Sequence, residues 1–230
     1  MSSYLYLIID LACISIPCIA SFYPKHAFYK EWIPFARANL IVMTFFLVWD
    51  IIFTHWGVWG FNPRYLLGIS FFNLPLEEVL FFICIPYASV FTYFALNYLT
   101  EWNPFSRFQR GLTLLLAVLL LVIGVTHYYK AYTFTTFLLC GSYLLTHYML
   151  KSDLSNFYRS FMIVLVFFFI SNGILTGSFI EEQVVWYDDN ENLGIRMGTI
   201  PVEDTFYGLL LILMHIDLMR YFGSRRKSTA

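Results

Sequence analysis

The sequence predicts an all-α membrane protein with about seven transmembrane helices, built as two parallel three-helix repeats joined by one linking helix. Two observations carry this prediction. Hydrophobic residues make up 59% of the 230 residues and charged residues only 13%, a balance typical of chains that cross a bilayer several times. In addition, one short acidic motif occurs twice, at corresponding places in the two halves of the chain.

Seven apolar stretches are each close to the roughly 20 residues that a helix needs to cross the hydrocarbon core. They cover residues 4–22, 35–53, 75–99, 111–127, 132–150, 158–178 and 201–221. The first stretch lacks the preceding basic region of a signal peptide, so we interpret it as a span and not as a cleaved leader. The fourth is the shortest. Tryptophans lie near the ends of the stretches or in the loops between them, as interfacial residues do.

The whole chain is expected to form a single integral-membrane domain, 1–230. Its predicted parts are a first repeat over residues 1–100, a linking span over 105–130, a second repeat over 131–223 and a short basic tail over 224–230. Because each repeat has three spans, the linking span is needed to give both halves the same orientation. Such a parallel repeat predicts a pseudo-two-fold axis along the membrane normal, with a site between the halves.

The distribution of basic residues predicts the orientation. In a seven-span layout the lysines and arginines, 14 in all, fall on one side except for Arg64, Lys130 and Arg196. The positive-inside rule then places the C-terminus in the cytoplasm and the N-terminus outside. The expected location is a bacterial inner membrane. A net charge of −1 gives no support for a nucleic-acid partner.

The repeated motif starts with Leu-Gly-Ile and ends with a proline followed by acidic residues. The first copy runs from Leu67 to Glu78, and the second begins at Leu193, which is 126 residues after Leu67. Pro75 and Pro201 each open an apolar stretch, and both are expected at the outer membrane face. Carboxylates are costly in a membrane-spanning segment. The pairs therefore form either duplicated helix caps or a two-part acidic site.

The acidic pairs have a structural and a chemical interpretation. Acidic residues in the first turn stabilise the positive end of a helix dipole by about 0.3–1 kcal/mol. Alternatively, carboxyl groups held together in a dry cavity share a proton and can serve as general acid and base for an apolar substrate. Aromatic residues, 21% of the chain, can stabilise a carbocation by ~0.5–2 kcal/mol per ring. We favour chemistry, with Glu77, Glu78, Glu203 and Asp204 as catalytic residues.

The residues around the acidic pairs extend the pattern. Pro75-Leu76-Glu77-Glu78 is followed by Phe81-Phe82, and Pro201-Val202-Glu203-Asp204 is followed by Phe206-Tyr207. These resemble the twin motifs of the integral-membrane lycopene cyclases, which occur as two small subunits in some bacteria and as a fused domain in fungal bifunctional carotenoid enzymes. Further positions that resemble the family are Trp49-Asp50, Trp56-Gly57-Val58-Trp59 and Asn172-Gly173. The chain departs from it in having a long, acidic outer loop over residues 179–200.

The resemblance implies a redox-neutral cyclisation, by an intramolecular lyase or isomerase, of the ψ-ends of lycopene to β-ionone rings, giving γ-carotene and then β-carotene. It implies that Asp50 and Asn172 orient the acidic pairs by hydrogen bonding. The other candidates for substrate binding or orientation are Trp49, Trp56, Trp59, His55, Pro75, Pro201, Phe81, Phe82, Phe206 and Tyr207. The expected partners are a lipophilic carotenoid, the lipid bilayer and other carotenoid-pathway enzymes.

No cofactor or metal is predicted. The sequence has no Gly-x-Gly-x-x-Gly after a strand, so nothing supports flavin or nicotinamide binding. Its histidines do not follow a metal-ligand spacing.

Other functions remain open at this level. A carotenoid hydratase would trap the same cation with water, and a non-catalytic carotenoid-binding protein or a proton-coupled transporter would also use intramembrane acids. A retinal protein is disfavoured because residues 201–221 contain no lysine. A prenyltransferase would need several spaced aspartate clusters for Mg²⁺-diphosphate, whereas Asp188-Asp189-Asn190 stands alone.

Overall fold

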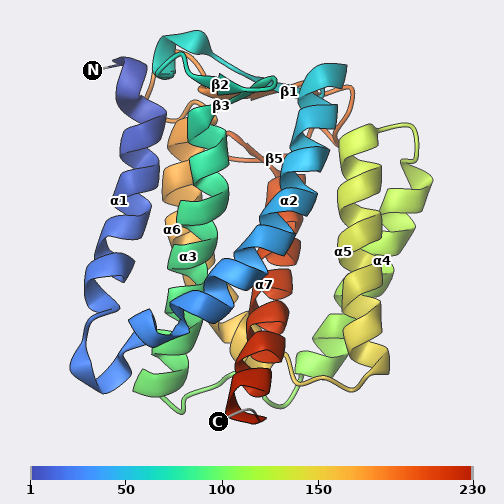
Figure 1. Cartoon of the computed structure of the whole chain (residues 1–230). Coiled ribbons are helices and arrows are strands. Elements are labelled where there is room, and N and C mark those ends of the chain that lie inside the picture. The colour runs from blue at the N-terminus through green and yellow to red at the C-terminus, as the bar shows by residue number, and fades with distance from the viewer. Residues whose placement is uncertain (1, 229–230) are drawn as a thin grey trace.

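The computed structural model describes residues 2–228, and this part of the chain is mostly helical (Figure 1). It contains seven α-helices, one for each apolar stretch, which confirms the predicted helical class and the order of the helices. They are α1 (Leu5–Ala20), α2 (Trp32–Trp56), α3 (Leu76–Leu99), α4 (Gln109–Thr126), α5 (Ala131–Met149), α6 (Ser155–Leu175) and α7 (Val202–Ser228). The side chains of the predicted basic tail, residues 224–230, lie outside the described residues.

Within the described residues, five segments are long and apolar enough to cross a membrane. They contain α2, α3, α4, α6 and most of α7. Helix α1 has 16 residues, about 24 Å at 1.5 Å per residue, against a hydrocarbon core of about 30 Å. Helix α5 has the length but is less apolar, because it carries Thr133, Thr135, Thr136 and Thr146. A seven-span layout therefore stays a prediction.

Six short strands lie at one end of the helices, where the sequence predicted only loops (Figure 1). They pair antiparallel as β1 (Trp59–Phe61) with β4 (Val185–Tyr187), β2 (Ser70–Phe71) with β3 (Leu74–Pro75), and β5 (Arg196–Met197) with β6 (Ile200–Pro201). Helices α3 and α7 begin directly after β3 and β6. The β2–β3 hairpin and the β5–β6 hairpin therefore set where α3 and α7 begin, and with them the acidic first turns of both helices.

The 126-residue offset of the motif recurs in the backbone. Ser70 pairs with Pro75, and Arg196 pairs with Pro201, in the same register. Gly68 (φ 81°) and Gly194 (φ 71°) adopt the left-handed conformation that glycine tolerates without steric cost. Between the halves, Gly60 of β1 pairs with Trp186, the residue 126 positions later. Equivalent segments of the two halves therefore have equivalent local structures and meet each other at β1 and β4.

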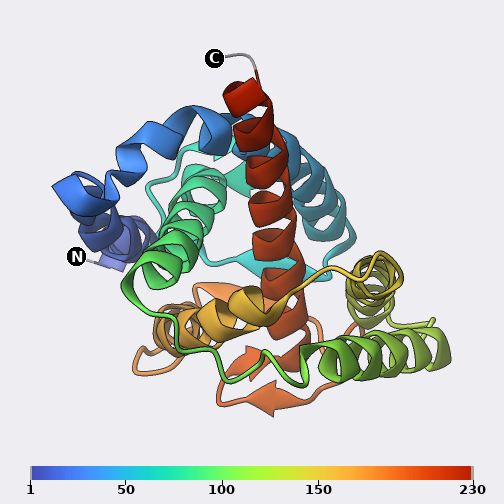
Figure 2. The same cartoon turned by 90° about the horizontal axis from the view of Figure 1, so that it is seen from below.

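The helices pack with α1 on α3, α2 on α7, and α3 on α6, while α4 packs on α5 at the edge of the bundle (Figures 1 and 2). The approach of α4 to α5 depends on Gly141, where an added Cβ would lie 2.9 Å from Leu121 Cγ. Aromatic rings fill the core between α2, α3 and α7. Phe46 lies 4.9 Å from Tyr207 and 6.1 Å from Phe82, measured between ring centroids.

Candidate active site

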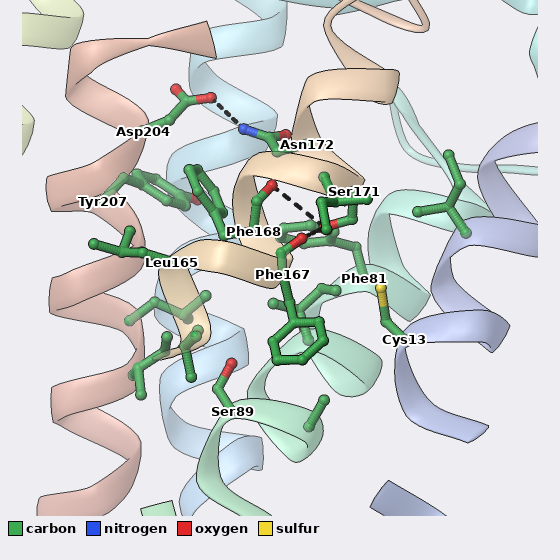
Figure 3. Close-up of a pocket in the computed structure, with 18 of the residues that line it drawn as sticks. Cys13, Phe81, Ser89, Leu165, Phe167, Phe168, Ser171, Asn172, Asp204 and Tyr207 are labelled. Atoms are coloured by element: carbon green, nitrogen blue, oxygen red, sulfur yellow. Dashed lines mark hydrogen bonds between the residues drawn. The ribbon is translucent and has the colours of Figure 1, made fainter. Parts of the chain in front are cut away.

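A cavity of about 490 Å³ lies between α1, α3, α6 and α7. Most of its wall is apolar, and α6 contributes the largest part, including Leu165, Phe167 and Phe168 (Figure 3). Residues of β1 and β4 line the end nearest the strands. The carboxyl groups of the cavity wall come from Asp50, Glu78 and Asp204. Among the described residues, no lysine, arginine or histidine lines it, so no basic side chain of the wall neutralises these acids.

Glu78 and Asp50 form the first part of the acidic site. Glu78 lies in the first turn of α3 and accepts a 2.6 Å hydrogen bond from the Tyr6 hydroxyl of α1. Asp50, from α2, lies within hydrogen-bond reach of Glu78 and accepts a 2.5 Å hydrogen bond from Trp59 Nε1. Asp50 Oδ2 has no hydrogen-bond donor among the described residues. A proton shared between the two carboxyl groups would supply one, because buried polar atoms are rarely left unpaired.

Asp204 forms the second part and has a different environment. Its Oδ1 accepts a 2.5 Å hydrogen bond from the Tyr132 hydroxyl. Its Oδ2 accepts from Asn172 Nδ2 at 2.8 Å, as Figure 3 shows. The same oxygen accepts from the Tyr187 hydroxyl at 2.9 Å. The amide of Asn172 thus takes the place that a second carboxyl group, Asp50, takes beside Glu78. Three donors hold Asp204 in one orientation, and the two parts of the site are chemically unequal.

Tyr187 lies in β4, outside the helices, and keeps its proton. Burial, and next the nearby Asp204 carboxylate, raise the pKa of the Tyr187 hydroxyl well above its usual value. The phenol is therefore a permanent hydrogen-bond donor to Asp204 at neutral pH. The Arg196 guanidinium lies 6.0 Å from the Tyr187 ring centroid and donates to Asp189 and to the Thr199 carbonyl.

The first member of each acidic pair has another position. Glu77 and Glu203 are both fully buried, and neither lines the cavity. Glu77 Oε1 accepts a 2.6 Å hydrogen bond from the Leu67 backbone N–H, and Glu203 Oε1 accepts a 2.8 Å bond from the Leu193 backbone N–H. Each side chain thus anchors the start of its own Leu-Gly-Ile segment. In both copies of the motif the first acid accepts a hydrogen bond from the residue that starts the motif, and the second acid lines the cavity.

Removal of the Glu203 anchor should destabilise the protein. Glu203→Ala would leave the Leu193 N–H and the Thr133 hydroxyl, which donates to Glu203 at 2.6 Å, without an acceptor in a buried place. An unsatisfied buried donor costs about 1–3 kcal/mol. We expect a lower thermal unfolding midpoint in detergent for Glu203→Ala than for Glu203→Gln, whose amide oxygen still accepts. Equal midpoints for the two variants would contradict the anchor.

The remaining predicted residues, apart from His55 and Trp56, divide into three groups. Trp59, Phe81 and Tyr207 line the cavity together with Asp50 and Asn172. Behind the wall, Trp49 packs on Tyr207 with ring centroids 5.1 Å apart, Phe82 packs on Phe46, and Phe206 packs on Phe137. Pro75 and Pro201 are buried strand residues that precede α3 and α7.

The positions of His55 and Trp56 differ from the prediction. Both were predicted to contribute to the site, but both side chains are exposed and neither lines the cavity. The reason is local. Helix α2 ends at Trp56, and Gly57 (φ 75°) turns the chain by its left-handed conformation, so that Trp59, two residues later, enters the site instead.

The sequence reasoning missed the tyrosines that hold the acids. Tyr6 and Tyr132 are 126 residues apart, and each donates to the acid that lies 72 positions after it. The same offset that identified the acidic motif would have identified this pair. Tyr187 carried no such signal, because the residue 126 positions before it is Phe61.

A family model described as lycopene cyclase matches residues 3–96 and 129–222. The second matched segment begins 126 residues after the first, so the match follows the internal repeat, and it covers well over half of the chain. No match to a curated protein was found. No match to a solved structure was found either.

Proposed function

Because the chain belongs to the lycopene cyclase family, we propose that it is a lycopene β-cyclase that converts the ψ-ends of lycopene to β-ionone rings, giving γ-carotene and then β-carotene. The observation that carries the proposal is the unequal acidic site at one end of an apolar cavity. Asp50 and Glu78 form a pair that can share a proton, while Asp204 is held by three donors. Of the four acids predicted to be catalytic, we assign the chemistry to Glu78 and Asp204.

The Asp50–Glu78 pair acts as the general acid. Two carboxyl groups within hydrogen-bond reach cannot both be ionised without strong repulsion, so one proton stays between them. Glu78, whose carboxyl group lines the cavity, delivers this proton to the terminal double bond of the ψ-end. The proton forms a new C–H bond, and a tertiary carbocation remains on the neighbouring carbon. A second double bond of the substrate then donates its π electrons to that carbon and closes the six-membered ring.

Asp204 acts as the base. Ring closure moves the positive charge into the ring, and loss of one ring proton leaves a new double bond there. Asp204 faces the cavity and is close enough to Glu78 for the two charges to interact. The hydrogen bonds from Tyr132, Asn172 and Tyr187 orient its carboxylate toward this proton. One proton is added and one is removed, so the reaction balances without an oxidant or reductant.

Aromatic rings stabilise the cationic intermediate. Phe81, Tyr207, Trp59 and Tyr187 line the cavity around the acids. The face of such a ring attracts a cation by about 0.5–2 kcal/mol, more when water is excluded. Because no basic side chain lines the described cavity, the wall favours positive charge on the substrate. This explains why the acids are surrounded by rings and not paired with basic residues.

The membrane layout completes the proposal. We infer that all seven helices cross the membrane, with α1 to α3 and α5 to α7 as equally oriented halves and α4 as the linking helix. The common start of α3 and α7 after matched hairpins supports this layout. The asymmetric distribution of basic residues supports an outer N-terminus and a cytoplasmic C-terminus. The acidic site then lies near the outer membrane face.

The activity is tested by expressing the chain in bacteria that accumulate lycopene and analysing the extracted pigments. We expect γ-carotene first and β-carotene at later times. Unchanged lycopene, with the protein verified in the membrane, would contradict the proposal. Hydroxylated acyclic products would instead identify a hydratase, in which water and not the second double bond traps the cation.

A further inference from the structure

One side of the cavity wall is also part of the outer surface of the bundle. On α1, the lining residue Ile16 is 75% exposed, and on α6 the lining residues Phe167 and Ile170 are 63% and 61% exposed. A residue that lines a cavity and is exposed to the surroundings lies at an opening. Helices α1 and α6 both pack mainly on α3 and little on each other. The cavity is therefore open between α1 and α6.

The opening is not repeated at the symmetry-equivalent place of the described cavity. It lies between α1 of the first half and α6 of the second half. By the 126-residue offset, α5 corresponds to α1, since α1 starts at Leu5 and α5 starts at Ala131. Nevertheless, Tyr132 is the only residue of α5 in the described cavity wall, and α4 contributes none. Helix α5 is instead packed between α4 and α7. The equivalent of α6 in the first half is α2, and Asp50 is its only residue in the described cavity wall, so this wall has no equivalent opening between α5 and α2.

The chemistry of the opening fits a hydrocarbon and not water. Its rim includes Ala12, Cys13 and Ile16 on α1 and Phe167, Ile170 and Ser171 on α6. Figure 3 shows Cys13, Phe167 and Ser171 of this set. The Ser171 hydroxyl donates to the Phe167 carbonyl of its own helix at 3.0 Å, and the Cys13 thiol lies near it across the gap. Because this hydroxyl is satisfied within its own helix, the rim is largely apolar. On α3 the cavity wall extends from Glu78 to Thr92, about 20 Å at 1.5 Å per residue. The acids stand at one end of this distance.

We propose that the gap between α1 and α6 is a lateral port through which one end of a linear carotenoid slides from the bilayer to the acids. The proposal rests on the proposed function for the identity of the hydrocarbon. Because the described cavity has one acidic site, each end of the symmetric substrate passes through this port in its own binding event. The half-converted, monocyclic carotenoid must withdraw before its second end reacts.

A tryptophan at the rim tests the port. Ala12 is exposed and lines the cavity, while its neighbour Leu11 is exposed but does not line it. Ala12→Trp should slow lycopene conversion by the purified protein in lipid nanodiscs at least tenfold. Leu11→Trp places the same bulk on the same helix and should stay within about twofold of the parent. Equal rates for the two tryptophan variants would overturn the port.

A reversible cross-link gives an independent readout. With Ser171→Cys, Cys13 gains a partner across the gap, and Cys84→Ala removes a thiol that also lies near Cys13. The oxidised protein should convert lycopene at least tenfold more slowly than the same protein after reduction. The oxidised control that also carries Cys13→Ala has no cross-link and should not change. Equal rates with the disulfide verified by mass spectrometry would also overturn the port.

Failure of the port and failure of the proposed function give different results. If the parent protein forms no cyclic product, the proposed function fails. The port is then tested by binding: lycopene is supplied in the nanodisc, the protein is repurified, and the absorption of the bound lycopene measures its uptake. Cross-linked protein that takes up lycopene more slowly than reduced protein still supports a lateral port. Uptake at the same rate contradicts it, whatever reaction the protein catalyses.

Discussion

Glu78→Gln should reduce the conversion of lycopene to cyclic products by 10²-fold or more. The substituted amide still accepts the hydrogen bond that Tyr6 donates to Glu78, so the local structure is kept. It cannot share and release a proton with Asp50, and a general acid typically contributes about 10²–10⁴-fold to the rate. The measurement is the initial rate of γ-carotene formation by purified protein, normalised to the amount of folded protein.

The neighbouring acid provides a matched control. Glu77→Gln changes the same residue type one position earlier, and its amide oxygen still accepts from the Leu67 backbone N–H. Because Glu77 does not line the cavity, this variant should keep the parental rate within a few fold. A large loss in Glu77→Gln beside a near-parental rate in Glu78→Gln would reverse the roles that we propose for the two acids.

Asp204→Asn should also reduce conversion by about 10²-fold or more, for a different reason. An amide at this position cannot take up the ring proton. Its NH₂ group would also face at least one of the three donors that now point at the carboxylate, from Tyr132, Asn172 and Tyr187. Because the Asp50–Glu78 pair is intact, protonation of the substrate can still begin. Pigment analysis should therefore show mainly unconverted lycopene. Any new product should come from a carbocation that reacted without losing the ring proton to Asp204.

Glu203→Gln is the control for the second pair. Its side chain still accepts from the Leu193 backbone N–H, and it does not reach the cavity wall. We expect near-parental conversion per folded molecule.

If Asp204→Asn converts lycopene to β-carotene at the parental rate, Asp204 is not the base, and the three hydrogen bonds around it serve the structure alone.

The sequence determined the helical class of the fold and the place of the candidate acidic site in the chain. Apolar stretches of bilayer length predicted seven helices, because hydrophobicity along the chain is a local property that packing does not alter. The duplicated motif predicted that Glu78 and Asp204 would occupy equivalent places, and both line one cavity. Tyr6 and Tyr132 are separated by the same constant offset. A local pattern does not reveal them, because each lies 72 residues before the acid to which it donates.

Only the tertiary structure decided which acid of each pair lines the cavity. Adjacent residues on a helix point about 100° apart, so either member could have faced inward, and the sequence treats them alike. The backbone N–H groups of Leu67 and Leu193 donate hydrogen bonds to Glu77 and Glu203, which holds these two side chains away from the cavity. Glu78 and Asp204 line the cavity instead. Likewise, the opening between α1 and α6 depends on how helices distant in sequence pack, and no local pattern encodes that. The sequence determined which acidic residues the chain offers, and the packing of the helices determined which of them face the cavity.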